Sequence, residues 1–183
     1  LLADATEGRA MFIEPVEKLM GNGKLIYIVG NHEDWLPALT EQIPSLEGIV
    51  DLKTLLKLDK WLIIPQGGAY NLGKLTFVHG DQLKGGEGVA KAAVIAYERS
   101  IRFGHFHTAQ LFTKTSVIDY KNAKTGMAIP CLCTKNPKYG AGMPNRWTQG
   151  FLFGYVEDDG MFNDTLVIIN NGRFVVHGKA YKG

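Results

Sequence analysis

Apolar positions in the first 110 residues alternate between the spacing of helices and the spacing of strands. Helical spacing predicts helices over residues 7–20, 45–61 and 89–99. Four residues of the third helix are expected to face a sheet: Ala92, Ala93, Ile95 and Ala96. Short apolar runs between turn residues predict strands at 25–29, 62–64, 75–78 and 101–103. Because strands that alternate with helices pair in parallel, we expect an α/β sheet with parallel members.

After residue 110 the pattern changes to short strands joined by turns that are rich in Gly, Asn and Asp. The predicted strands cover residues 115–120, 127–133, 150–157, 165–169 and 173–177. Residues 158–160 and 170–172 are typical of hairpin turns, and the Pro- and Gly-rich residues 136–146 are typical of a loop. We therefore expect an α/β fold of two packed mixed β-sheets, a β-sandwich flanked by helices.

The composition is that of one globular domain. With 183 residues, 45% of them hydrophobic, the chain can bury a sizeable single core, so we expect one domain over residues 1–183. The net charge of +2 comes from 20 basic and 18 acidic residues, without the basic stripe of nucleic-acid-binding proteins. No apolar run of about 18 residues occurs, so we expect no membrane-spanning segment.

Two cysteines, Cys131 and Cys133, stand two residues apart on a predicted strand. Their side chains would point to the same side of that strand without the geometry of an ordinary disulfide, which favours a reducing, cytoplasmic compartment. As a Cys-x-Cys pair they could bind a metal, but no second cysteine or histidine pair lies near them in the sequence. We favour the interpretation that they are small core residues.

Four of the five histidines fall in three glycine-flanked clusters, and each cluster follows a predicted strand. The clusters are Gly30-Asn31-His32-Glu33, Val78-His79-Gly80-Asp81 and Gly104-His105-Phe106-His107. Neutral imidazole is the commonest metal ligand, and a neighbouring glycine lets the backbone turn sharply where a strand ends. Since ligands collect at the carboxyl ends of strands in α/β sheets, the clusters predict one shared metal site. The alternative is that each is an isolated surface or core histidine, as we expect for His177.

These clusters, in this order, resemble the calcineurin-like metallophosphoesterase superfamily. Its later motif blocks are Gly-Asn-His-Asp/Glu, a histidine after an apolar strand, and Gly-His-x-His, which match residues 30–33, 79–80 and 104–107. The resemblance is close over residues 24 to about 110, and residues 131–151 are more loosely similar to phage-type members. It implies a hydrolase, either phosphatase or phosphodiesterase, that cleaves phosphomonoesters or phosphodiesters.

The resemblance also implies how the metal ligands divide. Asn31, His79 and His105 would bind one ion, and His107 would bind a second. Sites of this family hold two divalent ions, which polarise the phosphoryl oxygens and lower the pKa of a bridging water so that hydroxide attacks in line. The expected metals are manganese, iron, zinc or nickel. The nitrogen-rich ligand set of this chain favours zinc, nickel or copper over magnesium.

By the same resemblance, His32 would be the general acid that protonates the departing alkoxide. Imidazole is suited to this role because it exchanges protons readily near neutral pH. Glu33 could support one of these groups through a hydrogen bond, and a solvated loop carboxylate is the alternative that stays open. The same two interpretations stay open for Asp34 and Asp81.

The sequence departs from the family pattern in its amino-terminal part. Asp-x-His occurs nowhere in the chain, only 29 residues precede Gly30, and the first residue is leucine. We therefore expect an amino-terminal truncation, the loss of the carboxylate that bridges two ions, and at most one well-held metal ion. Two functions follow. One is a metallophosphoesterase acting on phosphate esters, with nucleotides or nucleic acids favoured by the phage-type likeness; the other is an inactive binding or structural module.

Overall fold

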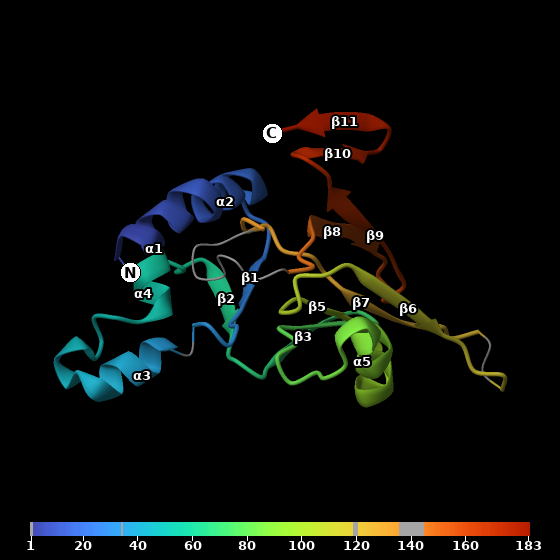
Figure 1. Ribbon diagram of the computed structural model, residues 1–183, viewed down its shortest axis with the longest axis horizontal. Coiled ribbons are helices and arrows are strands. Elements are labelled where there is room, and N and C mark those ends of the chain that lie inside the picture. Colours follow the sequence, from blue (N-terminus) through green and yellow to red (C-terminus); the bar gives the residue numbers. More distant parts are fainter. Residues whose placement is uncertain (1, 34, 119–120, 136–144) are drawn as a thin grey trace. The chain divides into compact units, whose positions relative to one another are not determined.

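The computed structural model describes residues 2–33, 35–118, 121–135 and 145–183, and the chain divides into two compact units (Figure 1). The first unit is Leu1–Gly68 and the second is Ala69–Gly183, and each is described by itself. The single domain expected over residues 1–183 stays a prediction. Asp34 lies outside the described residues, and so does most of the loop expected at 136–146.

A helical segment of three parts opens the first unit: α1 (Leu2–Gly8), a π-helical turn (Arg9–Ile13) and α2 (Glu14–Met20). The helix predicted over residues 7–20 is confirmed, and it begins earlier. Pro15 accounts for the wider turn, because proline has no N–H and its ring clashes with the carbonyl four residues before it. The apolar side chains are mostly outside the core, with Leu19 86% exposed and Ile13 buried.

The first unit also contains a two-stranded parallel sheet of β1 (Leu25–Ile28) and β2 (Trp61–Ile64). Both strands were predicted, at 25–29 and 62–64. Helix α3 (Trp35–Gln42) was not predicted, although Trp35, Leu36 and Leu39 have helical spacing.

The single helix predicted over residues 45–61 is wrong. A 3-10 turn (Pro44–Leu46) and the short helix α4 (Leu52–Leu56) stand in its place. Gly48 separates them with a left-handed φ of 74°, and α4 then begins anew at Asp51, whose carboxylate accepts a hydrogen bond from the backbone N–H of Thr54 at 3.0 Å. Apolar spacing continued across this break, so periodicity alone did not reveal it.

A five-stranded mixed sheet forms the centre of the second unit, in the order β3-β4-β5-β7-β6. Its strands are β3 (Ala69–Leu72), β4 (Leu75–Val78), β5 (Ser100–Phe103), β6 (Gln110–Lys114) and β7 (Lys124–Ala128). Strands β4, β5 and β7 pair in parallel, which confirms the expected parallel members. The edge strands β3 and β6 pair antiparallel with their neighbours, and neither was predicted.

Two strand predictions need correction here. Residues 115–118 of the strand expected at 115–120 are not a strand, because the pairing of β6 with β7 ends at Lys114. The strand expected at 127–133 is β7, which begins earlier and ends at Ala128. Pro130 lies just beyond it and has no N–H to continue the ladder.

Helix α5 (Val89–Tyr97) covers one face of this sheet (Figure 1). Its buried residues Val89, Ala93 and Val94 share one apolar cluster with Ile101 and Phe103 of β5. The helix predicted over 89–99 is confirmed, but the face expected to meet the sheet is wrong except for Ala93. The buried residues lie on the helix face that packs against β5. Ile95, which was expected on this face, is exposed.

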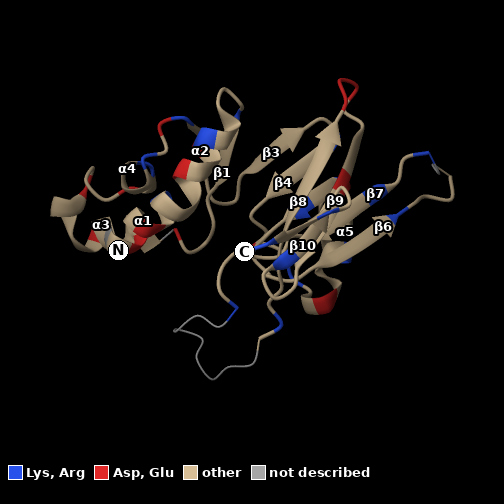
Figure 2. Cartoon of the chain, turned by 90° about the horizontal axis from the view of Figure 1, so that it is seen from above, with Lys and Arg blue, Asp and Glu red and all other residues tan. Residues whose placement is uncertain are grey.

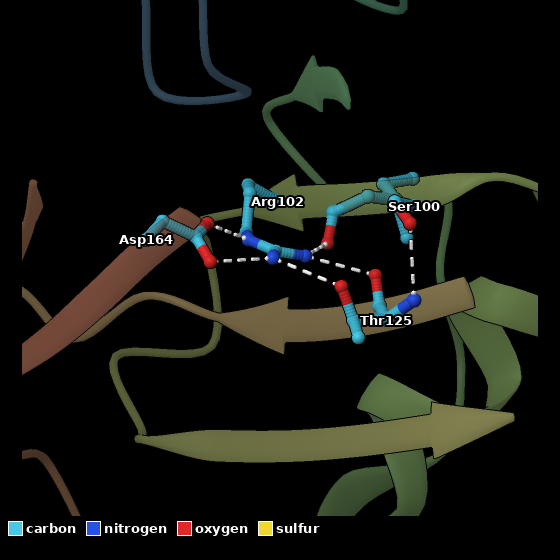
Figure 3. Close-up of polar contacts among 5 residues, drawn as sticks. Ser100, Arg102, Thr125 and Asp164 are labelled. Carbon is cyan, nitrogen blue, oxygen red and sulfur yellow. Dashed lines mark hydrogen bonds and ion pairs between the residues drawn. The ribbon is translucent and has the colours of Figure 1, made fainter. Parts of the chain in front are cut away.

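The opposite face of the sheet packs against a hairpin of β8 (Gln149–Val156) and β9 (Phe162–Ile169). Arg102 of β5 points to this face, because alternate residues of a strand face opposite sides. Its five N–H donors bond to the carboxylate of Asp164 in β9, to Thr125 in β7 and to the carbonyl of Ile101 (Figure 3). The Arg102 side chain is 1% exposed, so this ion pair is buried and fully hydrogen-bonded.

A second hairpin, β10 (Arg173–Val176) with β11 (Lys179–Lys182), follows β9. The strands predicted at 150–157, 165–169 and 173–177 are confirmed as β8, β9 and β10, and residues 158–160 and 170–172 form the turns between them. The chain is thus mixed α/β with several open sheets. The metallophosphoesterase-like sandwich of two packed sheets stays a prediction.

Charged residues are distributed over both units (Figure 2). This distribution agrees with the nearly balanced 20 basic and 18 acidic residues of the sequence. Across the described ranges, no helix combines the length and the apolar character that a bilayer crossing requires.

Replacing Asp164 with Ala should lower the free energy of unfolding by about 3–5 kcal/mol, because it leaves the Arg102 charge buried without a counterion. A double variant, Arg102→Met with Asp164→Leu, should lose much less, since no buried charge remains. The matched control is Asp59→Ala, which breaks the exposed pair of Lys53 and Asp59 at 3.7 Å and should change stability by less than about 0.5 kcal/mol. Urea unfolding measures all three; equal losses for Asp164→Ala and the control would contradict the prediction.

Candidate functional site

His79 and His105 meet at the carboxyl ends of two adjacent parallel strands. The last residues of β4 and β5, Val78 and Phe103, are register partners, so both chains leave the sheet at the same edge. The N–H of Gly104 donates to the carbonyl oxygen of His79 at 2.9 Å. The two imidazole rings lie 5.2 Å apart between centroids, edge to face at 74°. The structure therefore brings together two of the predicted metal ligands.

The loop that carries His105 and His107 has a strained backbone. Both residues have left-handed φ angles, 62° and 56°, which are uncommon for residues with a side chain. Each such residue costs on the order of 1–3 kcal/mol and persists only when the surroundings hold it. Phe106 provides that hold, because its ring packs on Phe103 at 5.9 Å and against the buried core. Strain of this kind, maintained by packing, is typical of functional loops.

His107 lies beside both cysteines of the chain. One ring nitrogen of His107 and the sulfur atoms of Cys131 and Cys133 all lie within 4.8 Å of one another. Cys133 is exposed and Cys131 is half-buried, so the interpretation of the pair as small core residues is wrong for Cys133. The grouping was missed in the sequence because Cys131 follows His107 by 24 positions; the Cys-x-Cys spacing was the one local signal.

Backbone hydrogen bonds hold this grouping in place. The N–H of Thr148 donates to the carbonyl oxygen of His107 at 2.8 Å, and the N–H of Cys131 donates to the carbonyl oxygen of Thr148 at 3.1 Å. The side-chain amide of Gln149 donates to the carbonyl oxygen of Cys133 at 2.9 Å. The ring of Trp147 packs edge to face on the ring of His107, 4.3 Å between centroids. One segment, residues 147–149, thus joins the histidine loop to the cysteine segment.

Burial raises the pKa of the Cys131 thiol to about 11, and the neighbouring Cys133 adds to this rise through a side-chain hydrogen bond and its charge. The Cys131 thiol therefore keeps its proton at neutral pH in the absence of a cation. Its sulfur also lies 3.4 Å from the carbonyl oxygen of Thr148, to which it donates.

In the first unit, Asn31, His32 and Glu33 follow β1, as predicted. The Glu33 carboxylate accepts hydrogen bonds from the N–H of Gly30 at 2.9 Å and from the hydroxyl of Tyr27 at 3.0 Å. Glu33 is therefore a half-buried, hydrogen-bonded residue of this loop rather than a fully solvated carboxylate, and its support of a metal ligand or of His32 stays a prediction. Burial, together with the charge of Glu33, raises the pKa of the Tyr27 hydroxyl.

The two remaining residues of that loop differ in their surroundings. His32 is exposed and its ring lies 5.1 Å from the ring of Trp35, which is itself 68% exposed. Asn31 is half-buried. Since Asn31 and His32 belong to the first unit, their convergence with His79 and His105 stays a prediction. In the second unit, Asp81 is half-buried in the turn after His79, and its role stays open.

Comparisons with models of known protein families, with curated proteins and with solved structures returned no match to this chain. The metallophosphoesterase resemblance therefore depends on the motif residues alone. The geometry adds two groups of potential metal ligands, the pair of His79 and His105 and the group of His107, Cys131 and Cys133.

The left-handed backbone of His105 predicts an unusual order of stabilities. His105→Gly should be about 1 kcal/mol more stable than His105→Ala, because only glycine adopts positive φ without strain. At His79, whose φ is not among the positive values, the order should reverse, with the glycine variant less stable than the alanine variant. Thermal unfolding of the four variants without metal measures this; the same order at both positions would contradict the strained loop.

Proposed function

We propose that this chain is a metal-dependent phosphoesterase that hydrolyses phosphomonoesters or phosphodiesters. The observation that carries the proposal is the pairing of His79 with His105 at the ends of adjacent parallel strands, with ring centroids 5.2 Å apart. The order of the Gly-Asn-His-Glu, His-Gly and Gly-His-x-His blocks supplies the reaction class by resemblance. Nucleotides and nucleic acids are the substrates to try first.

The donor set fits a divalent ion. Two imidazoles from neighbouring strand ends offer nitrogen ligands, and Asn31 would add an amide oxygen by resemblance. Nitrogen-rich sets of this kind suit zinc, nickel or copper better than magnesium. The chemistry that such an ion supplies is polarisation of the phosphoryl oxygens and a lowered pKa of a coordinated water.

The chain's own residues have separate tasks in this proposal. The strained loop after β5 keeps the His105 ring turned toward His79, and the packing of Phe106 keeps that loop in place. Glu33 fixes the loop that carries His32 by accepting from the N–H of Gly30. His32 is the general acid, donating its ring proton to the oxygen of the departing alcohol.

Hydrolysis of bis-p-nitrophenyl phosphate with added Mn²⁺ or Zn²⁺ tests the proposal. The expected rate is very low, because the sequence has no Asp-x-His block and no assigned carboxylate to bridge two ions. His105→Ala should remove the Mn²⁺ bound at the pair of His79 and His105 together with any turnover, whereas the control His177→Ala should change neither. Turnover that survives chelation, or that is equal in wild type and His105→Ala, would contradict metal-dependent catalysis at this pair.

Replacing His32 with Ala should leave the metal content unchanged and lower turnover by roughly 10²- to 10⁴-fold, the usual effect of a positioned general acid. The loss should be smaller for nitrophenyl esters than for alkyl esters, because nitrophenolate departs without a proton. Metal analysis alongside the two substrate series checks this. A loss of metal in His32→Ala, or equal losses for both ester classes, would contradict the general-acid assignment.

A catalytically inactive binding module is the second candidate, and one observation favours it. The first unit contains a cavity of about 490 Å³ whose walls are mainly apolar, including Leu36, Val50 and Ile63. Pockets of this size and character are typical of ligand-binding sites. Complete absence of metal-dependent turnover, with Mn²⁺ still bound by wild type and lost in His105→Ala, would favour this module over the enzyme.

A further inference from the structure

His107, Cys131 and Cys133 bring one nitrogen and two sulfur donors to one place, and we call them the His-Cys-Cys cluster. The donor atoms lie within 4.8 Å of one another. His107 comes from the loop after β5, and the two cysteines come from the segment after β7. The two segments are far apart in the sequence. The parallel pairing of β5 with β7 brings them together.

The separations are close to those of a tetrahedral zinc site. Zinc–sulfur bonds of about 2.3 Å and zinc–nitrogen bonds of about 2.0 Å place the donors of one ion roughly 3.5–3.8 Å apart. The donor atoms therefore need to approach one another by about 1.0–1.3 Å at most to reach these separations.

The backbone around the cluster is already arranged for binding. The left-handed φ of His107 and the hydrogen bond from Thr148 to its carbonyl oxygen orient the loop, and Trp147 packs on the imidazole ring. Cys131 forms a parallel bridge with Gln149, whose side chain also bonds to the Cys133 carbonyl. Binding of a metal ion therefore costs little conformational entropy, because the chain around the cluster is already ordered.

Access and donor type identify the kind of ion. Cys133 is exposed, and His107 and Cys131 are half-buried, so solvent can deliver an ion. Two thiolates and one imidazole are soft or borderline ligands, which select zinc over manganese or magnesium. Three protein ligands leave one of four tetrahedral positions to water, as in zinc sites that are not purely structural.

We propose that the chain binds one Zn²⁺ through His107, Cys131 and Cys133, with water in the fourth position. As the two zinc–sulfur bonds form, the two thiols release their protons to solvent. The ion connects the loop that carries His105 and His107 to the segment after β7, and so stiffens that loop. In this assignment His107 binds the same ion as the two cysteines. The proposal does not depend on the proposed phosphoesterase function.

Cobalt substitution tests the cluster directly. The reduced, metal-free chain is titrated with Co²⁺ and then with Zn²⁺, with native mass spectrometry for stoichiometry. A thiolate-to-cobalt charge-transfer band in the near ultraviolet is expected, which Zn²⁺ abolishes by displacement. Cys133→Ser should remove most of the band. It should also weaken zinc binding by more than roughly 100-fold, which is the upper end of the loss expected for a residue that only hydrogen-bonds to a ligand. His107→Ala should weaken zinc binding while retaining part of the band.

Matched controls separate this site from the His79–His105 pair and from misfolding. The double variant His79→Ala with His105→Ala, and the single variant His177→Ala, should keep the charge-transfer band at wild-type strength. Since Cys133 is exposed, Cys133→Ser should keep the wild-type circular dichroism spectrum and unfolding midpoint without metal. A wild-type chain with two free thiols and no band, or a band unchanged in Cys133→Ser, would overturn the proposal. So would a band that disappears in the His79→Ala, His105→Ala double variant.

Discussion

The second unit depends on one buried strand and its arginine. Strand β5 has no exposed residue, because Ile101 and Phe103 pack under α5 while Arg102 points to the hairpin of β8 and β9. A guanidinium is tolerated in such a place only when each donor is satisfied, and Arg102 meets this condition through Asp164, Thr125 and the Ile101 carbonyl (Figure 3). The bonds join three strands from distant parts of the sequence. Strand β5 ends one residue after Arg102, at Phe103, where the histidine loop begins.

In that loop, packing against the core holds the backbone in an unfavourable but defined conformation. Left-handed residues at His105 and His107 would relax in an isolated peptide, since they gain nothing locally from positive φ. Phe106 lies between them and packs against the core, so the stability of the core offsets the strain on both sides. The consequence is that two neighbouring histidines hold different partners. His105 meets His79, and His107 meets the cysteines and Trp147.

The two groups of donors differ in chemical character. Imidazoles at the ends of β4 and β5 suit borderline divalent ions that activate water, whereas thiols next to an imidazole suit zinc and other thiophilic ions. Cys133 is exposed and Cys131 is half-buried, and backbone hydrogen bonds join Cys131 and His107 to Thr148. In the zinc proposal, the segment after β7 supplies ligands that the family resemblance does not include.

Periodicity in the sequence determined the elements whose signals are local. Strands β1, β4 and β5, helix α5, the β8–β9 hairpin with its Asp-Gly turn, the Asn-Gly turn before β10, and the placement of His79 and His105 after strands all follow from spacing and turn chemistry, whereas β11 was not predicted. Tertiary structure decided what depends on distant partners. It broke the helix expected over 45–61, turned Ile95 outward, and kept Glu33 hydrogen-bonded within its loop. It also brought His107 to Cys131 and Cys133 through the pairing of β5 with β7, a contact that no local pattern encodes.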